Sequence, residues 1–286
     1  MATHLPHLAD VDRISSRVVR ILGGNPSKFT LQGTNTYLVG QGPKRILIDT
    51  GDTPTAPIWL KSLKQALADE KAEIQQVILT HWHPDHVGGV KDVRTLFPDV
   101  KVYKNQPGAD QLNIDDGQRF QVEGATLRSF HSPGHTTDHM ALTLEEEDAM
   151  FTGDNVLGHG TAVFEDLPAY IKSLQGMQQA FSGRAYPGHG DVIEDGKAKI
   201  TEYIAHRQQR EDQILDVLKQ SRETGKPAAK GWASMEMVKV IYKDYPENLH
   251  APAEGGVLQV LKKLEGEGRV RKVDGSRWDL GSKAAL

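Results

Sequence analysis

Residues 80–89 read THWHPDHVGG and place four candidate metal ligands within six positions of the chain: His81, His83, Asp85 and His86. The cluster directly follows the apolar run at 76–80, QVILT, which predicts a buried strand. Burying these side chains without partners would cost several kcal/mol each. The main alternative to a metal site is therefore an exposed polar loop, in which water satisfies them. The pattern predicts a metal site at the end of a strand.

Three further candidate ligands occur downstream, each after a predicted strand and beside a glycine that lets the backbone turn sharply. They are His135 in HSPGHT (131–136), Asp154 in FTGDN (151–155) and His189 in YPGHG (186–190). The chain has no Cys, so His, Asp, Glu or water must supply every ligand. Such a set suits zinc, with manganese and iron as alternatives. The recurrence favours a metal site over the polar loop.

Taken in order, these motifs resemble the metallo-β-lactamase superfamily. The resemblance implies an α/β protein with a four-layer αββα fold and a site that holds two divalent metal ions. It implies that His81, His83 and His135 bind one metal, that Asp85, His86 and His189 bind the second, and that Asp154 bridges both. Asp49, in LIDTG (47–51), matches the family's aspartate that orients a ligand and fixes its tautomer.

A two-metal centre of this kind predicts a hydrolase. The metals would activate a hydroxide nucleophile and polarise the substrate's oxygen. Asp85 is the predicted catalytic residue, which shuttles the proton. Asn35 and His159 are predicted substrate-binding residues, because both lie on loops that should border the cleft; ordinary loop positions are the alternative. Trp82 is predicted to pack beside the metals, and His139 is assigned no role.

Three further segments resemble the lactamase-β-like-2 group of this superfamily: QGTNTYLV (32–39), TTDHMAL (136–142) and FEDL (164–167). That group contains animal endoribonucleases that cut single-stranded RNA and fungal thioesterases that release polyketides from acyl carrier protein. Segments 153–160 and 183–189 are similar to the fungal branch. The resemblance therefore implies a thioesterase whose partner is an acyl carrier protein or a polyketide synthase, with the endoribonuclease as the alternative. A glyoxalase-II-like thioester hydrolase and a nucleic-acid-binding protein with a vestigial metal site are further alternatives.

The hydrophobic pattern divides the chain into a catalytic domain, 1–206, and a small winged-helix-like domain, 207–286. In the first, apolar runs and turns predict a hairpin at 36–49, and helical spacing predicts helices at 57–70 and from Asp166 to about Phe181. Further strands are predicted at 100–104, 118–131 and 139–152, and a short one ends at Ala185-Tyr186. In the second, three helices precede a predicted hairpin at 269–280, whose turn is Asp274-Gly275.

The charge balance argues against a dedicated nucleic-acid binder, because 34 basic residues face 38 acidic ones. Residues 207–286 carry 15 basic and 12 acidic side chains, an excess too small to indicate polyanion binding by itself. This balance favours the thioesterase, although a few basic residues near the cleft would fit an acidic carrier protein as well as RNA. The first 22 residues lack the apolar core of a signal peptide, and no run approaches the roughly 20 apolar residues of a membrane span. A cytoplasmic protein is expected.

Overall fold

The computed structural model describes residues 5–223 and 231–283. Its contacts divide the chain into two units, Met1–Thr201 and Glu202–Leu286. The division falls inside α5 (Gly196–Glu223), the same helix that contains the predicted boundary at residues 206 and 207.

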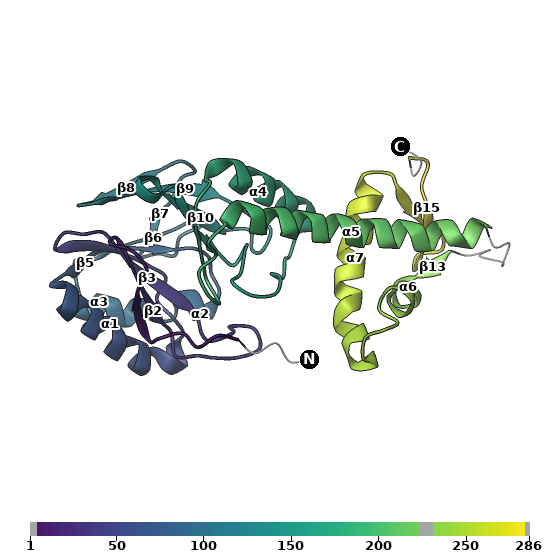
Figure 1. Ribbon diagram of the computed structural model, residues 1–286. Coiled ribbons are helices and arrows are strands. Elements are labelled where there is room, and N and C mark those ends of the chain that lie inside the picture. Colours follow the sequence, from purple (N-terminus) through teal and green to yellow (C-terminus); the bar gives the residue numbers. More distant parts are fainter. Residues whose placement is uncertain (1–4, 224–230, 284–286) are drawn as a thin grey trace. The chain divides into compact units, whose positions relative to one another are not determined.

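The first unit is built from two sheets and the helices that flank them (Figure 1). Its seven-stranded sheet contains β1 (Val11–Arg13), β2 (Val18–Leu22), β3 (Asn35–Val39), β4 (Lys44–Ile48), β5 (Glu73–Leu79), β6 (Lys101–Lys104) and β7 (Leu112–Asn113), in that order. Its five-stranded sheet contains β12 (Ala185–Pro187), β11 (Ala149–Gly153), β10 (Met140–Leu144), β9 (Ala125–His131) and β8 (Arg119–Val122), in that order. The helices of this unit are α1 (Ala56–Glu70), α2 (Pro84–Val87), α3 (Val90–Leu96), α4 (Leu167–Ala180) and the start of α5.

Strand direction places several chain segments at one edge of each sheet. The strands from β4 to β7 are parallel, and β11 is parallel to β12. The carboxyl ends of parallel strands lie at the same edge of a sheet, so the loops that follow β4 and β5 are neighbours. The same holds for the loops that follow β11 and β12. These four loops carry most of the predicted site.

Two apolar cores hold the layers together. Between the sheets, Ile48 and Ile78 of one sheet pack with Leu142 and Phe151 of the other, all of them buried. β2 and β3 are buried along their whole length, because both faces of this sheet are covered.

On the outer face of the seven-stranded sheet, Trp59 and Leu63 of α1 and Val93 of α3 form the second core. On the outer side of the other sheet, Gly176 of α4 lies against Phe130 of β9. These layers confirm the predicted αββα architecture.

Most predicted elements are confirmed, and two are corrected. The hairpin at 36–49 forms as β3 and β4, and the helices at 57–70 and near 166–181 form as α1 and α4. The single strands predicted at 118–131 and 139–152 are each two antiparallel strands. In the first, Gly124 turns the chain with a φ of 75°, a conformation open to glycine. In the second, a short 3-10 turn at Glu145–Glu147 separates the strands.

The second unit has the helices and wing of a winged helix. After the C-terminal part of α5, it contains β13 (Trp232–Ala233), α6 (Ser234–Ile241), α7 (His250–Gly266), β14 (Val270–Lys272) and β15 (Arg277–Leu280). The strands form one sheet in the order β13-β15-β14, which confirms the predicted hairpin. Glu211 is buried in this unit, and its carboxylate is compensated by Lys263 at 2.7 Å and Arg269 at 3.5 Å.

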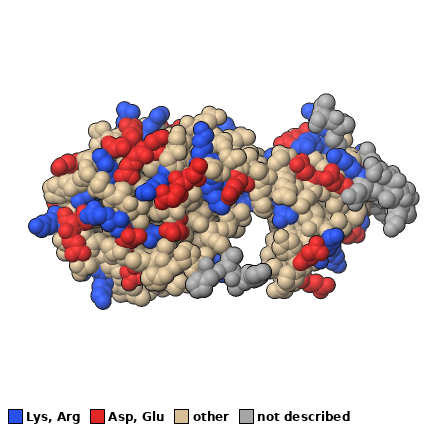
Figure 2. Space-filling view, viewed as in Figure 1, with Lys and Arg blue, Asp and Glu red and all other residues tan. Residues whose placement is uncertain are grey.

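Acidic and basic side chains are interspersed over the visible face of the first unit (Figure 2). Among the described residues, no helix is both long and apolar enough to cross a membrane.

Candidate metal centre

The seven predicted ligands lie together at the carboxyl ends of the strands. His81, His83, Asp85 and His86 follow β5, and three more loops supply the others: His135 follows β9, Asp154 directly follows β11, and His189 follows β12. The side chains form two groups that could each hold a metal ion. One contains His81, His83, His135 and Asp154, and the other contains Asp85, His86 and His189.

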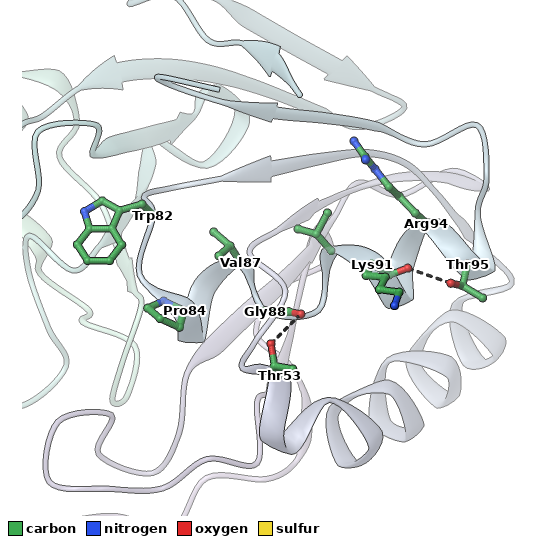
Figure 3. A pocket seen from close by; sticks show the side chains of 9 residues that line it. Thr53, Trp82, Pro84, Val87, Gly88, Lys91, Arg94 and Thr95 are labelled. Carbon is green, nitrogen blue, oxygen red and sulfur yellow. Dashed lines mark hydrogen bonds between the residues drawn. The ribbon is translucent and has the colours of Figure 1, made fainter. Parts of the chain in front are cut away.

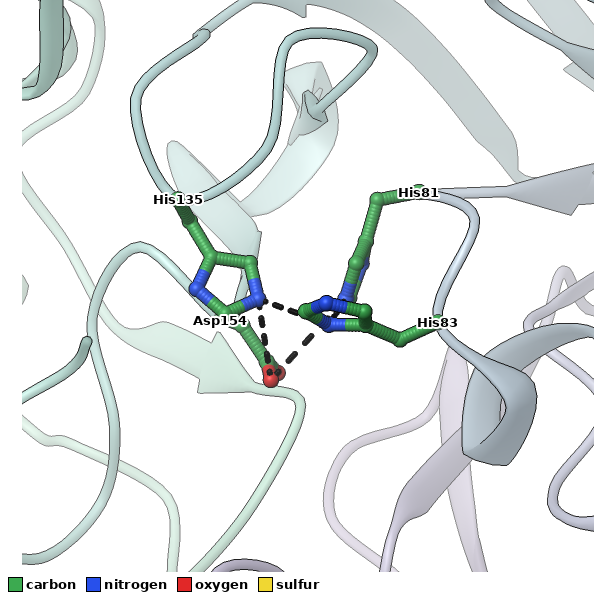
Figure 4. A group of neighbouring side chains, drawn as sticks. All are labelled: His81, His83, His135 and Asp154. Atoms are coloured by element: carbon green, nitrogen blue, oxygen red, sulfur yellow. Dashed lines mark hydrogen bonds and ion pairs between the residues drawn. The ribbon is translucent and has the colours of Figure 1, made fainter. Parts of the chain in front are cut away.

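In the first group, three imidazoles converge on one carboxylate (Figure 4). His83 Nδ1 lies 2.9 Å from His81 Nε2 and 3.0 Å from His135 Nε2. Asp154 Oδ2 lies 3.6 Å from His135 Nε2 and 3.9 Å from His81 Nε2. Three imidazole nitrogens and a carboxylate oxygen directed at one point are a typical donor set for zinc or another divalent transition metal.

In the second group, the same Asp154 carboxylate is shared. His189 Nε2 lies 3.3 Å from Asp85 Oδ2 and 3.2 Å from Asp154 Oδ2. His86 Nε2 lies 3.4 Å from Asp85 Oδ2 and 3.4 Å from Asp154 Oδ1. Asp154 thus reaches both groups, which is the geometry that a bridging ligand requires.

Asp49 controls the protonation of two of these imidazoles. It accepts a hydrogen bond from His86 Nδ1 at 2.8 Å, so the other nitrogen of His86 presents a lone pair to the site. Asp49 also accepts from the hydroxyl and from the backbone N–H of Thr80, both at 2.8 Å. The Thr80 hydroxyl donates its only hydrogen to the bond with Asp49. It therefore accepts a hydrogen bond from His81 Nδ1, 3.0 Å away. The His81 Nε2 lone pair therefore also faces the site.

The electrostatics of the site favour bound cations. Burial opposes ionisation of Asp154, but His189 and His86 outweigh it and hold the pKa of this carboxyl well below its usual range. The pKa of Asp85 is likewise lowered, by His86 and His189 against the effect of burial. Burial and the neighbouring His86 hold the pKa of His81 well below its usual value.

His86 has the opposite shift. Burial alone would lower its pKa, but Asp154 and Asp49 raise it well above its usual value. The ionised carboxylates around His86 thus favour a positive charge at this site, which a bound metal ion would supply.

Two buried atoms support this fit. His86 Nε2 and Asp154 Oδ1 have no hydrogen-bond partner among the described residues, although both are shielded from water. Buried polar atoms are nearly always paired, and a metal ion would satisfy both of these at once. Close packing reinforces the arrangement, because a Cβ at position 188 would lie 2.3 Å from Asp154 Oδ1. Glycine is therefore required beside the ligand loop.

Asn35 and Thr34 hold the site from the side of β3. The Asn35 amide donates to the carbonyls of Pro187 and Gly190, at 2.9 and 2.8 Å, and so fixes the loop that carries His189. The Thr34 hydroxyl donates to Asp85 Oδ2 at 2.8 Å. Asn35 is buried, so the contacts seen for it are positioning contacts, and its predicted role in substrate binding stays a prediction.

Replacing Asn35 with Ala should lower the free energy of unfolding by about 2 kcal/mol, because the carbonyls of Pro187 and Gly190 each lose one hydrogen bond. The Tyr37 hydroxyl still donates to the Pro187 carbonyl. Urea denaturation of the metal-free protein measures this change. Asn113→Ala, at an exposed position, is the matched control and should change stability by less than about 0.5 kcal/mol. Equal stability of the two variants would contradict a positioning role for Asn35.

His139 is a positioning residue that the sequence did not reveal. Its Nε2 accepts the backbone N–H of Asp154 at 3.1 Å, and its Nδ1 therefore donates to Ser132 Oγ at 2.9 Å. The ring is fully buried. The signal available in the sequence was another histidine close to His135, in TTDH (136–139), but only the fold places it behind the bridging carboxylate.

A cavity of about 490 Å³ opens over the metal centre. His83, Asp85, His135, Asp154 and His189 contribute to its wall. Its remaining wall is largely apolar and includes Phe29, Leu31, Leu157, Ala162 and Val163. His159 also lines this cavity, in agreement with its predicted place beside the cleft; its contact with substrate stays a prediction.

Trp82 packs beside the candidate ligands and is partly open to solvent. It lies between two candidate ligands, and its ring centroid is 4.5 Å from that of His83, but 49% of the residue is exposed. The preceding strand turns His81 inward, so the next side chain points outward. Its ring thus packs against a candidate ligand, as predicted.

The sequence matches two family profiles over parts of its length and several relatives over most of it. A profile of the metallo-β-lactamase superfamily matches residues 29–106, and one of the β-lactamase-associated winged helix domain matches residues 233–278. The chain is 49% identical over 272 residues to an atrochrysone carboxyl ACP thioesterase of Aspergillus chevalieri, covering 94% of this chain and 87% of that one. It is 46% identical to the lactamase-like protein ptaB of Pestalotiopsis fici, covering 93% and 85%. A solved β-lactamase domain protein from Burkholderia ambifaria has the same fold, with a TM-score of 0.79 at 17% identity, covering 98% of this chain and 96% of that one.

Proposed function

Because the chain belongs to the metallo-β-lactamase superfamily, we propose that it hydrolyses the thioester that links a polyketide or another acyl group to an acyl carrier protein. The observation that carries this proposal is the cavity above the metal centre. Five of its lining residues come from the His/Asp groups, and apolar side chains surround them. An acyl chain could bury its apolar surface there while its thioester carbonyl meets the polar end.

Basic side chains are scarce in this cavity. Among the described residues that line it, Lys28 is the one Lys or Arg. Nucleic-acid binding usually depends on several phosphate contacts, whereas an acyl chain needs an apolar wall. The lining therefore supports a thioester over single-stranded RNA.

The names of the relatives support the same substrate class. The relative from Aspergillus chevalieri is named an atrochrysone carboxyl ACP thioesterase, and the similarity extends over both units of this chain. A carrier-bound acyl group and its carrier protein are thus the substrate and partner that we propose.

We propose that His81, His83 and His135 hold one divalent ion, that Asp85, His86 and His189 hold the other, and that Asp154 holds both. Zn²⁺ suits this all-His/Asp set best, with Mn²⁺ and Fe²⁺ as alternatives. When bound, the ions supply an activated water nucleophile and polarise the carbonyl of the substrate.

The chain's own residues keep this site ready for the reaction. Asp49 and Thr80 hold two imidazoles with their lone pairs directed inward. Asp85 is held ionised, and Thr34 fixes one of its oxygens, so its carboxylate can orient the attacking water and receive its proton. In the overall reaction, the oxygen of water forms a C–O bond with the carbonyl carbon and the C–S bond breaks. The products are the free acid and the carrier's thiol, whose hydrogen comes from the water.

Incubation with an acylated carrier protein tests this proposal. We expect the metal-loaded protein to release free acid and one thiol per thioester, measured by mass spectrometry and a thiol reagent. Protein stripped with a chelator should lose this activity, and reloading should restore it.

Two results would contradict the thioesterase. One is thioester cleavage no faster than in the stripped control. The other is metal-dependent cleavage of a labelled single-stranded RNA oligonucleotide by protein that leaves the thioester intact, which would establish the endoribonuclease instead.

A further inference from the structure

A second hollow, of about 690 Å³, lies beside the metal centre along α2 and α3 (Figure 3). We name it the α2–α3 groove. It is lined by Thr53, Trp82, Pro84, Val87, Gly88, Val90, Lys91, Arg94 and Thr95. Trp82 and Pro84 lie at one end, and Lys91, Arg94 and Thr95 lie at the other. The groove therefore changes from aromatic and apolar to basic along its length.

The apolar end of the groove adjoins the metal centre. Pro84 lines both the groove and the cavity over the metals. Trp82 lies between two candidate ligands, and its ring is in contact with that of His83. A linear ligand that lies over Trp82 would thus need to pass only Pro84 for its end to reach the candidate metal ligands.

The opposite end of the groove offers two cationic groups. Lys91 is exposed at the start of α3. Arg94 is one helical turn further on and is partly exposed. Arg94 donates to the backbone carbonyl of Asp110, and its Nη1 lies 3.8 Å from the Asp110 carboxylate, a highly exposed group. Such an exposed pair is weak, so Arg94 can exchange this partner for another anion.

We propose that the α2–α3 groove binds the phosphopantetheine arm of the acylated carrier protein. The phosphodiester of the arm would lie on Lys91 and Arg94, and its amide chain would cross Trp82. This inference rests on the proposed function, because the arm is what connects a carrier protein to its thioester. The arm is linear, anionic at the protein end and uncharged at the thioester end, and this polarity matches the groove from its basic end to the metals.

Two small substrates that differ only in the phosphate test this assignment. They are an acyl thioester of phosphopantetheine and the same acyl thioester of pantetheine. For the double variant Lys91→Ala/Arg94→Ala, we expect the KM for the phosphorylated substrate to rise about tenfold, because two exposed charge contacts are lost. The KM for the unphosphorylated substrate and both kcat values should stay within about twofold. Lys101→Ala, which removes an exposed charge at the start of β6, is the matched control and should change neither KM.

Three kinetic outcomes would overturn the assignment. The first is an unchanged KM for the phosphorylated substrate, and the second is an equal change for both small substrates. The third is an effect confined to the intact carrier protein, which would mean that these basic residues bind the carrier's own surface.

Calorimetry with phosphopantetheine and pantetheine, neither of them acylated, separates this proposal from the hydrolytic one. Wild-type protein should bind the phosphorylated compound about tenfold more tightly, and the double variant should lose that preference. The protein can show this binding preference even if it cleaves no thioester. The hydrolysis assay and the calorimetry can therefore fail independently of each other. Equal binding of the two compounds by wild-type protein would overturn the groove assignment.

Discussion

Asp154→Ala should lower kcat for thioester hydrolysis by about three orders of magnitude. This carboxylate is the one that lies within 3.2 to 3.9 Å of His189, His86, His135 and His81. Both candidate metal groups therefore lose a ligand in one substitution. Asp85, the other carboxylate of the described groups, lies near His86 and His189 of the second group.

The measurement combines steady-state kinetics with metal analysis of the purified protein. We expect the Asp154→Ala variant to hold less metal and to remain folded by circular dichroism. Asp99→Ala removes a carboxylate at an exposed position and serves as the matched control, with wild-type kcat and metal content expected. A variant that lacks the Asp154 carboxylate but keeps a kcat within threefold of wild type would show that the residue does not bridge catalytic metals.

Asp49→Asn should have the second largest effect, a loss of about a hundredfold in kcat and of about ten- to a hundredfold in metal affinity. The Asp49 carboxylate accepts hydrogen bonds from His86 and from Thr80, whereas an Asn side chain offers one acceptor and one donor group. One partner must then turn or change its tautomer, which places a proton where a metal should bind. The backbone tolerates this change, because Asp49 has a φ of 59° and Asn adopts that conformation readily.

Thr80→Val separates the two branches of this network. It removes the hydroxyl between Asp49 and His81 but leaves the direct hydrogen bond from His86 to Asp49. We therefore expect a smaller loss of metal affinity than for Asp49→Asn, measured by competition with a chelating dye. Wild-type metal affinity in Asp49→Asn would contradict the tautomer argument, and so would a larger loss in Thr80→Val.

The sequence predicts the candidate ligands well because they lie in short, local motifs. His81 to His86 follow one strand, and His135, Asp154 and His189 each follow another strand at a glycine-containing turn. Their convergence also requires the two sheets to pack with these strand ends together, because the loop after β5 leaves one sheet and the loops after β9, β11 and β12 leave the other. The residues that hold them are harder to predict, since their contacts cross the fold. His139 binds the backbone of Asp154 and Asn35 binds the loop of His189, and each pair is far apart in the sequence.

The errors in secondary structure have a similar cause. Apolar residues alternate with polar ones at Phe120 and Val122, and again at Ala125 and Leu127, on either side of the turn at Gly124. Because a single short turn separates these two alternating runs, the pattern predicts one strand.

Titration of chelator-treated protein with Zn²⁺ tests the central claim most directly. Thiol release from an acylated carrier protein is followed as the metal is added, and bound metal is counted at each step. The account predicts that activity is absent without metal and reaches its maximum at two bound ions per chain, with Mn²⁺ or Fe²⁺ as the substitutes if Zn²⁺ is the wrong ion. Hydrolysis by the metal-free protein, or the absence of thiol release with both sites fully occupied by each of the three ions in turn, would contradict it.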